Sequence, residues 1–317
     1  MKRTLAVLMA CALAVAGATA GDLAGRSAAA AEVTAAGRSA VYGGGPFYEG
    51  GQAVIDTLRS SGFTTVNLWS IHVHDNGDLY YNDHLVVSGG AYVGDPGWPA
   101  RLRTLKEAPT SVNRVEVSVG AWGTADWESI DNLITRDGTG ADTILYRNFL
   151  ALLDATGADA INNDDESHYE VESTVTFARM VNAMGYRNFT IAPYTARSHW
   201  QGVTSELGAL VDRVYLQAYA GGAGNDPAAW AQALGMPVDP GLWSNHGSGC
   251  AEGNSPAQVE TQMRTWRETA AIPGGFMWLY DDMQQCGTPA DYANAINNAT
   301  TTRTVGCIRS RCAQDAP

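Results

Sequence analysis

The chain has 317 residues and a formal net charge of −13 at pH 7, from 20 basic and 33 acidic side chains. This length is enough for one large domain or two small ones. A strongly acidic chain without a cluster of basic residues is a poor nucleic-acid binder. The charge therefore excludes nucleic acid as a partner and favours a neutral or cationic substrate.

The first 20 residues predict a secretory signal peptide. A basic start at residues 1–3 precedes an apolar run at 5–18, and residues 18–20 fit the small-x-small cleavage pattern. The run is too short to span a bilayer, and no later run is long enough to do so. We therefore expect a secreted, extracellular monomer without a membrane anchor, with a flexible Ala/Gly-rich segment at 21–38.

Four of the five cysteines lie beyond the predicted cleavage site, which favours two disulfides in an oxidising compartment. Four cysteines permit three pairings. We favour Cys250–Cys286, which would join two late loops, and a local Cys307–Cys312 bridge in the tail at 299–317. The cysteine spacings do not match those of zinc sites, so a zinc site is not expected.

Short β-branched or apolar segments alternate with helical patterns over residues 39–298. This alternation predicts an α/β fold, a single closed (β/α)8 barrel. An open doubly wound sheet is disfavoured because no Gly-x-Gly-x-x-Gly motif follows a strand. The predicted strands are 40–43, 64–71, 114–120, 158–163, 188–193, 211–218, 236–242 and 274–279, and helical patterns include 52–59, 144–155, 175–184 and 256–270.

The connection at 75–96, after the second strand, is unusually long for this fold. The sequence Asp-Asn-Gly-Asp at 75–78 predicts a tight turn, and residues 79–81 predict a short strand behind it. Long loops of a barrel lie most easily at its mouth. We expect a hairpin-like insertion there that forms one wall of a cleft.

Residues 159–166 are the most informative stretch, because an apolar strand leads into a run of polar and acidic residues. If 158–166 is a strand, Asn162, Asp164 and Glu166 project from one face at its carboxyl end. Two carboxylates so placed can cleave a glycosidic bond, one protonating the leaving oxygen and the other stabilising positive charge. A solvated acidic loop and a calcium site remain open alternatives.

Two other strands carry side chains that suit a pocket at the barrel mouth. Ser118 and Gly120 share one face of the third strand and leave room beside the fourth. Tyr215, Gln217 and Tyr219 alternate with apolar residues along the sixth strand and should point inward. Buried phenol and amide groups need hydrogen-bond partners, which either a polar ligand or the backbone could supply.

Tryptophan is abundant, with nine residues in the chain. Trp278 lies near the end of the eighth strand, where its ring could form a flat floor for a sugar. Trp69 on the second strand and Trp122 after the third are further candidates for sugar contact. A core position is an equally good interpretation of any one of them.

Taken in order, these motifs resemble those of glycoside hydrolase family 18, the chitinases and endo-β-N-acetylglucosaminidases. The resemblance covers residues 39–298, and its specific element is the fourth-strand motif. The matching segments are Ser118-x-Gly120, Asp159-x-x-Asn162-x-Asp164-x-Glu166, Tyr215-x-Gln217-x-Tyr219 and Trp278.

The resemblance implies retaining, substrate-assisted hydrolysis of β-linked N-acetylglucosamine-containing polysaccharide or glycan, without a metal or organic cofactor. Glu166 would be the general acid/base. Asp164 would orient the substrate's 2-acetamido group, whose carbonyl oxygen attacks the anomeric carbon. Tyr219 would donate a hydrogen bond to that oxygen, with Gln217 beside it, and Trp278 would floor the sugar subsite. Tyr215 and Asn162 would be further substrate-binding residues.

One residue of the central motif departs from the family, which usually has Asp where Asn162 stands. An Asp there shares a proton with the central carboxyl group and raises its pKa. An amide cannot do this, although it can donate a hydrogen bond to Asp164. We therefore expect Asp164 to stay ionised more readily, and Asn163 and Asp165 to face away and be structural.

Two other functions remain open. His72-x-His74 ends the second strand and could hold a divalent metal with His199 and His246, as in metal-dependent barrel hydrolases. A barrel that binds sugar without turnover is the second alternative, and Asn162 leaves room for it. Retention of the acid/base candidate argues against such a binding module.

Overall fold

The computed structural model describes residues 33–35 and 37–304. Residues Thr34–Arg303 form one compact unit. The predicted signal peptide, most of the Ala/Gly-rich segment and the Cys307–Cys312 pair lie outside the described residues.

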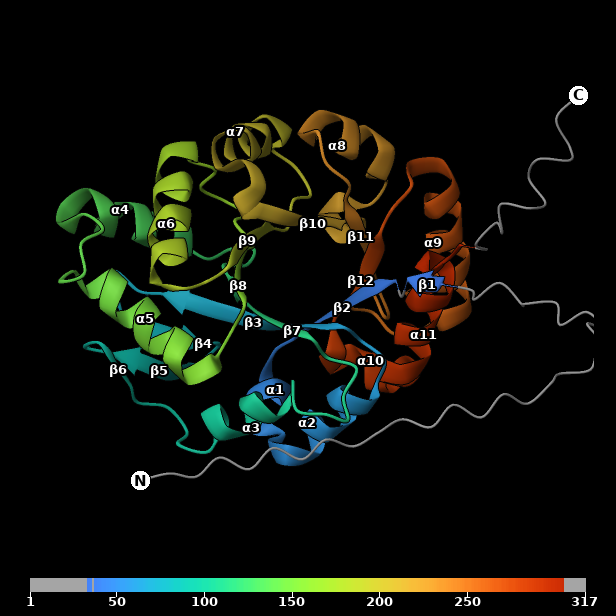
Figure 1. Cartoon of the computed structure of the whole chain (residues 1–317), viewed down its shortest axis with the longest axis horizontal. Helices are drawn as coiled ribbons and strands as arrows, with labels where there is room; N and C mark the ends of the chain where they lie inside the picture. Colours follow the sequence, from blue (N-terminus) through green and yellow to red (C-terminus); the bar gives the residue numbers. More distant parts are fainter. Residues whose placement is uncertain (1–32, 36, 305–317) are drawn as a thin grey trace, which may run out of the picture. The chain divides into compact units, whose positions relative to one another are not determined.

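Eight parallel strands form a closed barrel, which confirms the predicted α/β fold (Figure 1). Each strand pairs with the next around the ring, and β12 closes it by pairing with β2. The barrel strands are β2 (Arg38–Gly43), β3 (Thr65–Val73), β7 (Arg114–Val119), β8 (Ala160–Asn163), β9 (Asn188–Ile191), β10 (Val211–Gln217), β11 (Asp239–Trp243) and β12 (Gly274–Trp278).

Helices surround the barrel in an outer ring (Figure 1). In α5 the apolar Leu145, Phe149 and Leu152 recur at helical spacing and are buried, Thr143 caps the first turn, and Gly157 ends the helix with φ 60°. The helices are α1 (Gly45–Glu49), α2 (Gly51–Ser60), α3 (Trp98–Thr104), α4 (Asp126–Asp137), α5 (Ile144–Thr156), α6 (Val171–Met184), α7 (Arg197–Leu207), α8 (Pro227–Leu234), α9 (Pro256–Ala270), α10 (Tyr280–Cys286) and α11 (Pro289–Thr300), with short 3-10 turns at Gly208–Leu210 and Ala220–Gly222.

The connection after β3 forms an antiparallel ribbon of β4 (Leu79–Tyr81), β5 (His84–Ser88) and β6 (Ala91–Tyr92). Its strands lie beside α5 (Figure 1). Val86 and Val87 of β5 are fully buried, so packing holds this ribbon against the outside of the barrel.

Three further features concern the ends of the described chain and its late loops. β1 (Val33–Ala35) and β13 (Thr302–Thr304) pair as a separate two-stranded sheet. Cys250 and Cys286 form a disulfide, which confirms the pairing favoured from the sequence. Within the described residues, no helix combines the length and apolar character that a membrane crossing requires.

Candidate active site

Three acidic residues, Asp164, Asp165 and Glu166, follow β8 at the carboxyl end of the barrel. The predicted strand at 158–166 is too long, since β8 ends at Asn163 and Glu166 lies in a bend beyond it. The Asp164 backbone still donates to Val119 O at 2.9 Å, which extends the sheet pairing by one residue.

The strand ends early because Asp165 folds the following chain into a turn. Its buried carboxylate accepts backbone hydrogen bonds from Ser167, His168 and Tyr169 at 3.0, 2.9 and 2.7 Å. Asn163 accepts one from the Asp165 backbone at 2.7 Å. These local bonds confirm that Asn163 and Asp165 are structural.

Gln217, the last residue of β10, brings the two acidic side chains together. Its Nε2 lies 3.1 Å from Asp164 Oδ1 and 3.1 Å from Glu166 Oε1, and it also contacts the carbonyl of Ala192 at 3.1 Å. Asp164 is buried, whereas Glu166 is half-buried. One amide therefore joins a deep carboxyl group and a shallower one.

The surroundings raise the pKa of both carboxyl groups. Burial and then the charge of Glu166 hold the pKa of Asp164 well above its usual value, opposed by a hydrogen bond from Trp69. Burial raises the pKa of Glu166, opposed by the hydrogen bond from Gln217. Asp164 therefore ionises less readily than an exposed carboxyl group, although position 162 carries no second Asp.

An aromatic cavity of about 360 Å³ opens beside these groups. Trp278 forms part of its wall and packs parallel to Tyr219, with ring centroids 6.0 Å apart and planes at 17°. The Tyr219 hydroxyl has no hydrogen-bond partner among the described residues. The lining residues are Trp122, Glu166, Tyr194, Gln217, Tyr219, Ala220, Gly221, Trp243 and Trp278.

The other two tryptophan candidates have different positions. Trp69 packs edge-on against Trp278 at 4.6 Å and donates from its indole nitrogen to Asp164 Oδ2 at 3.1 Å. It is not part of the cavity lining. Trp122 is 80% exposed and lies on the cavity rim. Trp69 therefore binds the Asp164 carboxylate through a hydrogen bond, whereas the Trp122 side chain is exposed to solvent.

Two predicted substrate-binding residues lie inside the barrel and not on the cavity wall. The hydroxyl of Tyr215, which is fully buried, donates to Glu116 Oε1 at 2.8 Å. Asn162 is also fully buried, and its amide donates to Thr190 Oγ1 at 2.9 Å. The Asn162 amide, which could have donated to Asp164, makes no such bond among the described residues and is directed to Thr190 instead.

Gly120 does leave the space beside the fourth strand that the sequence indicates. Its φ is 100°, and a Cβ atom there would lie 2.6 Å from the Asp164 carbonyl oxygen and 2.9 Å from the indole nitrogen of Trp127. A larger residue would push the acidic turn out of place.

Trp243 and Tyr194 also line the cavity, although neither was predicted as a site residue from the sequence. Both lie at the carboxyl ends of strands, where side chains of a barrel reach the mouth. Trp243 Nε1 donates to Asp282 Oδ2 at 2.7 Å, which fixes its ring. Their positions next to the predicted strand ends were the available signal.

The histidines proposed as metal ligands do not converge. His72 Nδ1 pairs with Asp126 Oδ2 at 2.9 Å, and His74 stacks on Tyr80 with ring centroids 4.2 Å apart. His199 is buried against Trp200, whereas His246 packs near Trp243. Across residues 33–35 and 37–304, no three His, Cys, Asp or Glu side chains gather as a metal site. The metal-dependent alternative is not favoured.

No family model matches this sequence, and no curated protein is significantly similar to it. The structure, in contrast, is similar to solved family 18 structures. A family GH18 chitinase catalytic domain from the fern Peteris ryukyuensis is 16% identical, with 84% of this chain and 100% of that chain covered and a TM-score of 0.57. The chain shares its fold with family 18.

Two further solved structures agree. A fungal endo-β-N-acetylglucosaminidase of family 18 is 15% identical over 82% of this chain and 98% of its own, with a TM-score of 0.64. A chitinase from Aspergillus fumigatus is 16% identical over 77% and 91%, with a TM-score of 0.58. At such identities the similarity shows the fold alone.

Proposed function

We propose that this protein is a secreted glycoside hydrolase that cleaves β-linked N-acetylglucosamine-containing polysaccharide or glycan with retention of configuration. The observation that carries the proposal is the Gln217 amide, which joins Asp164 and Glu166 beside an aromatic cavity. Family 18 motifs in the sequence and the family 18 fold support it independently.

Glu166 is the proposed general acid/base. It lines the cavity, so it can reach the oxygen of a glycosidic bond placed there. Burial raises its pKa, which keeps the proton available at a higher pH than for an exposed Glu. After the leaving sugar departs, the same carboxylate can remove a proton from the attacking water.

Asp164 is proposed to hold the substrate's acetamido group. Both of its oxygens are fixed by donors, Oδ1 by Gln217 and Oδ2 by Trp69. A carboxylate fixed in this way stabilises the positive charge that develops as the acetamido oxygen attacks the anomeric carbon. The unpartnered Tyr219 hydroxyl is the proposed donor to that oxygen.

The aromatic walls are proposed to bind the apolar faces of sugar rings. Trp278, Tyr219 and Trp243 present flat surfaces around the cavity. Trp122 on the rim offers an exposed ring for a further sugar. Rings of this kind bind pyranose faces without requiring charge on the ligand.

Secretion is proposed on separate grounds. The first 20 residues have the pattern of a signal peptide. The Cys250–Cys286 disulfide is consistent with an oxidising compartment. Expression in a secreting host, followed by N-terminal sequencing of the product in the medium, tests this part.

The activity is tested by incubating purified protein with chitin oligomers, glycoproteins that carry N-glycans, and glucans without acetamido groups. We expect cleavage of one or both acetamido substrates, with the β-anomer of the new reducing end appearing first in the NMR spectrum. Cleavage of the glucans at equal rates, or first appearance of the α-anomer, would contradict a mechanism that depends on the acetamido group.

A further inference from the structure

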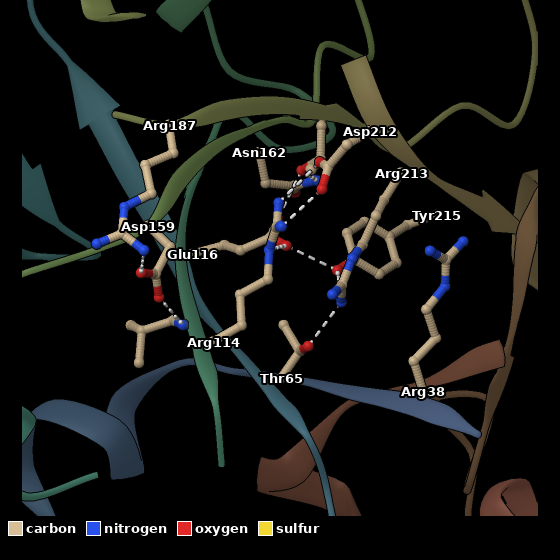
Figure 2. Close-up of polar contacts among 12 residues, drawn as sticks. Arg38, Thr65, Arg114, Glu116, Asp159, Asn162, Arg187, Asp212, Arg213 and Tyr215 are labelled. Carbon is tan, nitrogen blue, oxygen red and sulfur yellow. Dashed lines mark hydrogen bonds and ion pairs between the residues drawn. The ribbon is translucent and has the colours of Figure 1, made fainter. Parts of the chain in front are cut away.

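A chain of buried hydrogen bonds runs beneath the acidic pair, from Asn162 to Glu116 (Figure 2). Asn162 Nδ2 lies 2.9 Å from Thr190 Oγ1, and Thr190 Oγ1 lies 2.5 Å from Glu116 Oε2. All three side chains are fully buried. Solvent therefore cannot satisfy any donor or acceptor that the protein leaves unpaired.

Donors surround the carboxyl group of Glu116. Arg114 Nε donates to Oε1 at 2.6 Å, and the Tyr215 hydroxyl donates to the same oxygen at 2.8 Å. Arg114 also forms two bonds to Asp212, at 2.7 and 2.9 Å (Figure 2). Glu116 forms a buried ion pair with Arg114, and a carboxylate in such a pair accepts hydrogen bonds and donates none.

This carboxylate determines which group donates and which accepts in each hydrogen bond from Glu116 to Asn162. Because Glu116 only accepts, the Thr190 hydroxyl must give it its single hydrogen. The Thr190 oxygen can then only accept from position 162. This fixes the Asn162 amide with its NH2 toward Thr190 and its oxygen toward the hydroxyls of Tyr42 and Ser118, which donate at 3.0 and 2.9 Å.

We infer that Glu116 is a positioning residue that acts through Thr190 and makes an amide obligatory at position 162. A carboxylate there would place an acceptor against the Thr190 oxygen with no hydrogen between them. Glu116 thereby keeps a third carboxyl group away from Asp164. The role of Glu116 in positioning Asn162 follows from the hydrogen bonds alone. Only its effect on catalysis rests on the proposed function.

A double-mutant cycle in thermal unfolding tests the inference. At pH 7, Asn162→Asp should lower Tm by roughly 5–10 °C. In the Glu116→Gln background the same change should cost less than half as much, because the new amide can donate to Thr190 and free its hydroxyl for Asp at 162. Equal losses in both backgrounds would overturn the coupling.

The pH dependence of the single variant gives a second test, which needs no change at Glu116. Around position 162 lie Tyr42 on β2, Glu116 and Arg114 on β7, Asp164 after β8 and Tyr215 on β10. The unfavourable contact raises the folded-state pKa of the introduced Asp above its unfolded value. Below its unfolded-state pKa, about 3.9, this Asp therefore does not reduce the free energy of unfolding. The free energy of unfolding falls as the pH rises from there toward the folded-state pKa.

The Tm deficit of Asn162→Asp should accordingly shrink as the pH falls from the folded-state pKa of this Asp toward about 3.9, because the neutral acid can donate to Thr190. Asn162→Leu, which has no titratable group, should show a deficit that does not change with pH relative to the parent protein. A deficit of Asn162→Asp that is equally independent of pH would overturn the inference, whatever the Glu116 variants do.

The catalytic consequence has its own readout. In the Glu116→Gln background, Asn162→Asp adds a carboxylate near Asp164, which should raise the pKa of Asp164 and move the acidic limb of the rate profile upward by about one pH unit. An unmoved limb in an active double variant would overturn this part. If the parent protein cleaves no glycan, the proposed function fails and the unfolding experiments still decide the role of Glu116.

Discussion

Trp69 on β3 donates a hydrogen bond of 3.1 Å to the carboxylate of Asp164, which directly follows β8 on the other side of β7. Burial and the charge of Glu166 raise the pKa of Asp164, and the indole bond is the contact that lowers it. The tryptophan thus helps to keep the acid ionised in surroundings that favour its neutral form.

Trp69→Phe should therefore raise the pKa of Asp164 further. If Asp164 acts as a carboxylate, the acidic limb of the kcat profile should move to higher pH, because a more basic group must lose its proton before turnover. Trp98→Phe is the control, since it removes another indole hydrogen bond, to Phe47 O, in α3. An acidic limb that stays in place in Trp69→Phe would contradict the charged role of Asp164.

Glu166→Gln should lower kcat by about 10³-fold and leave sugar affinity nearly unchanged, because the amide keeps the shape of the side chain but has no proton to transfer. Steady-state kinetics and calorimetric binding of a chitin oligomer measure the two quantities. The exposed Glu172→Gln on α6 is the matched control and should behave as the parent. Loss of less than tenfold in kcat would reject Glu166 as the acid/base.

Gln217→Met should raise the pKa of Glu166, because the hydrogen bond from Gln217 lowers it. A general acid must be protonated, so its activity is lost as pH rises through its pKa. The basic limb of the rate profile should therefore move to higher pH. Gln201→Met on α7, outside the cavity, should leave the profile unchanged. A basic limb that moves downward would be inconsistent with this role of the amide.

Trp122→Ala should raise KM about tenfold for oligosaccharides, which corresponds to about 1.4 kcal/mol of lost binding. Its Tm should hardly change, because the side chain is 80% exposed. Leu85→Ala, a truncation of another exposed apolar residue, should leave both KM and Tm near the parent values. An unchanged KM with a lower Tm would show that Trp122 is structural.

Replacement of Cys250 and Cys286 by Ser should lower the free energy of unfolding by about 3–4 kcal/mol, from the chain entropy of the closed loop. Denaturant unfolding of the double variant measures the loss. Reduction of the parent protein should produce a loss of the same size, and the reduced and double-variant proteins should not differ. A stable double variant would show that the bridge contributes little.

The order of strands and helices was predictable because each strand is a short apolar run between helical patterns. The end of β8 was not predictable, because it depends on side chains that bind backbone N–H groups in place of the sheet pairing. Asp165 accepts three backbone hydrogen bonds from the residues after it. The alternation of polar and apolar residues along a strand gives no indication of such a turn.

The acidic pair and Gln217 could be placed from strand ends, since all barrel strands present those ends at one mouth. The hydrogen bonds of Asn162 could not be predicted, because Thr190 and Glu116 belong to neighbouring strands that are far from Asn162 in the sequence. The burial of Asp164 could not be predicted for the same reason. Its burial comes from side chains such as Trp69, which local sequence does not reveal.

The turn locked by Asp165 means that the backbone beneath Glu166 is held by its immediate neighbours. Glu166 lines the cavity from this turn. The rim residues Trp122, Tyr194 and Trp243 come from three other segments, after β7, after β9 and at the end of β11. Natural or laboratory evolution can therefore reshape the entrance for new glycans one loop at a time, while the reactive centre stays in place.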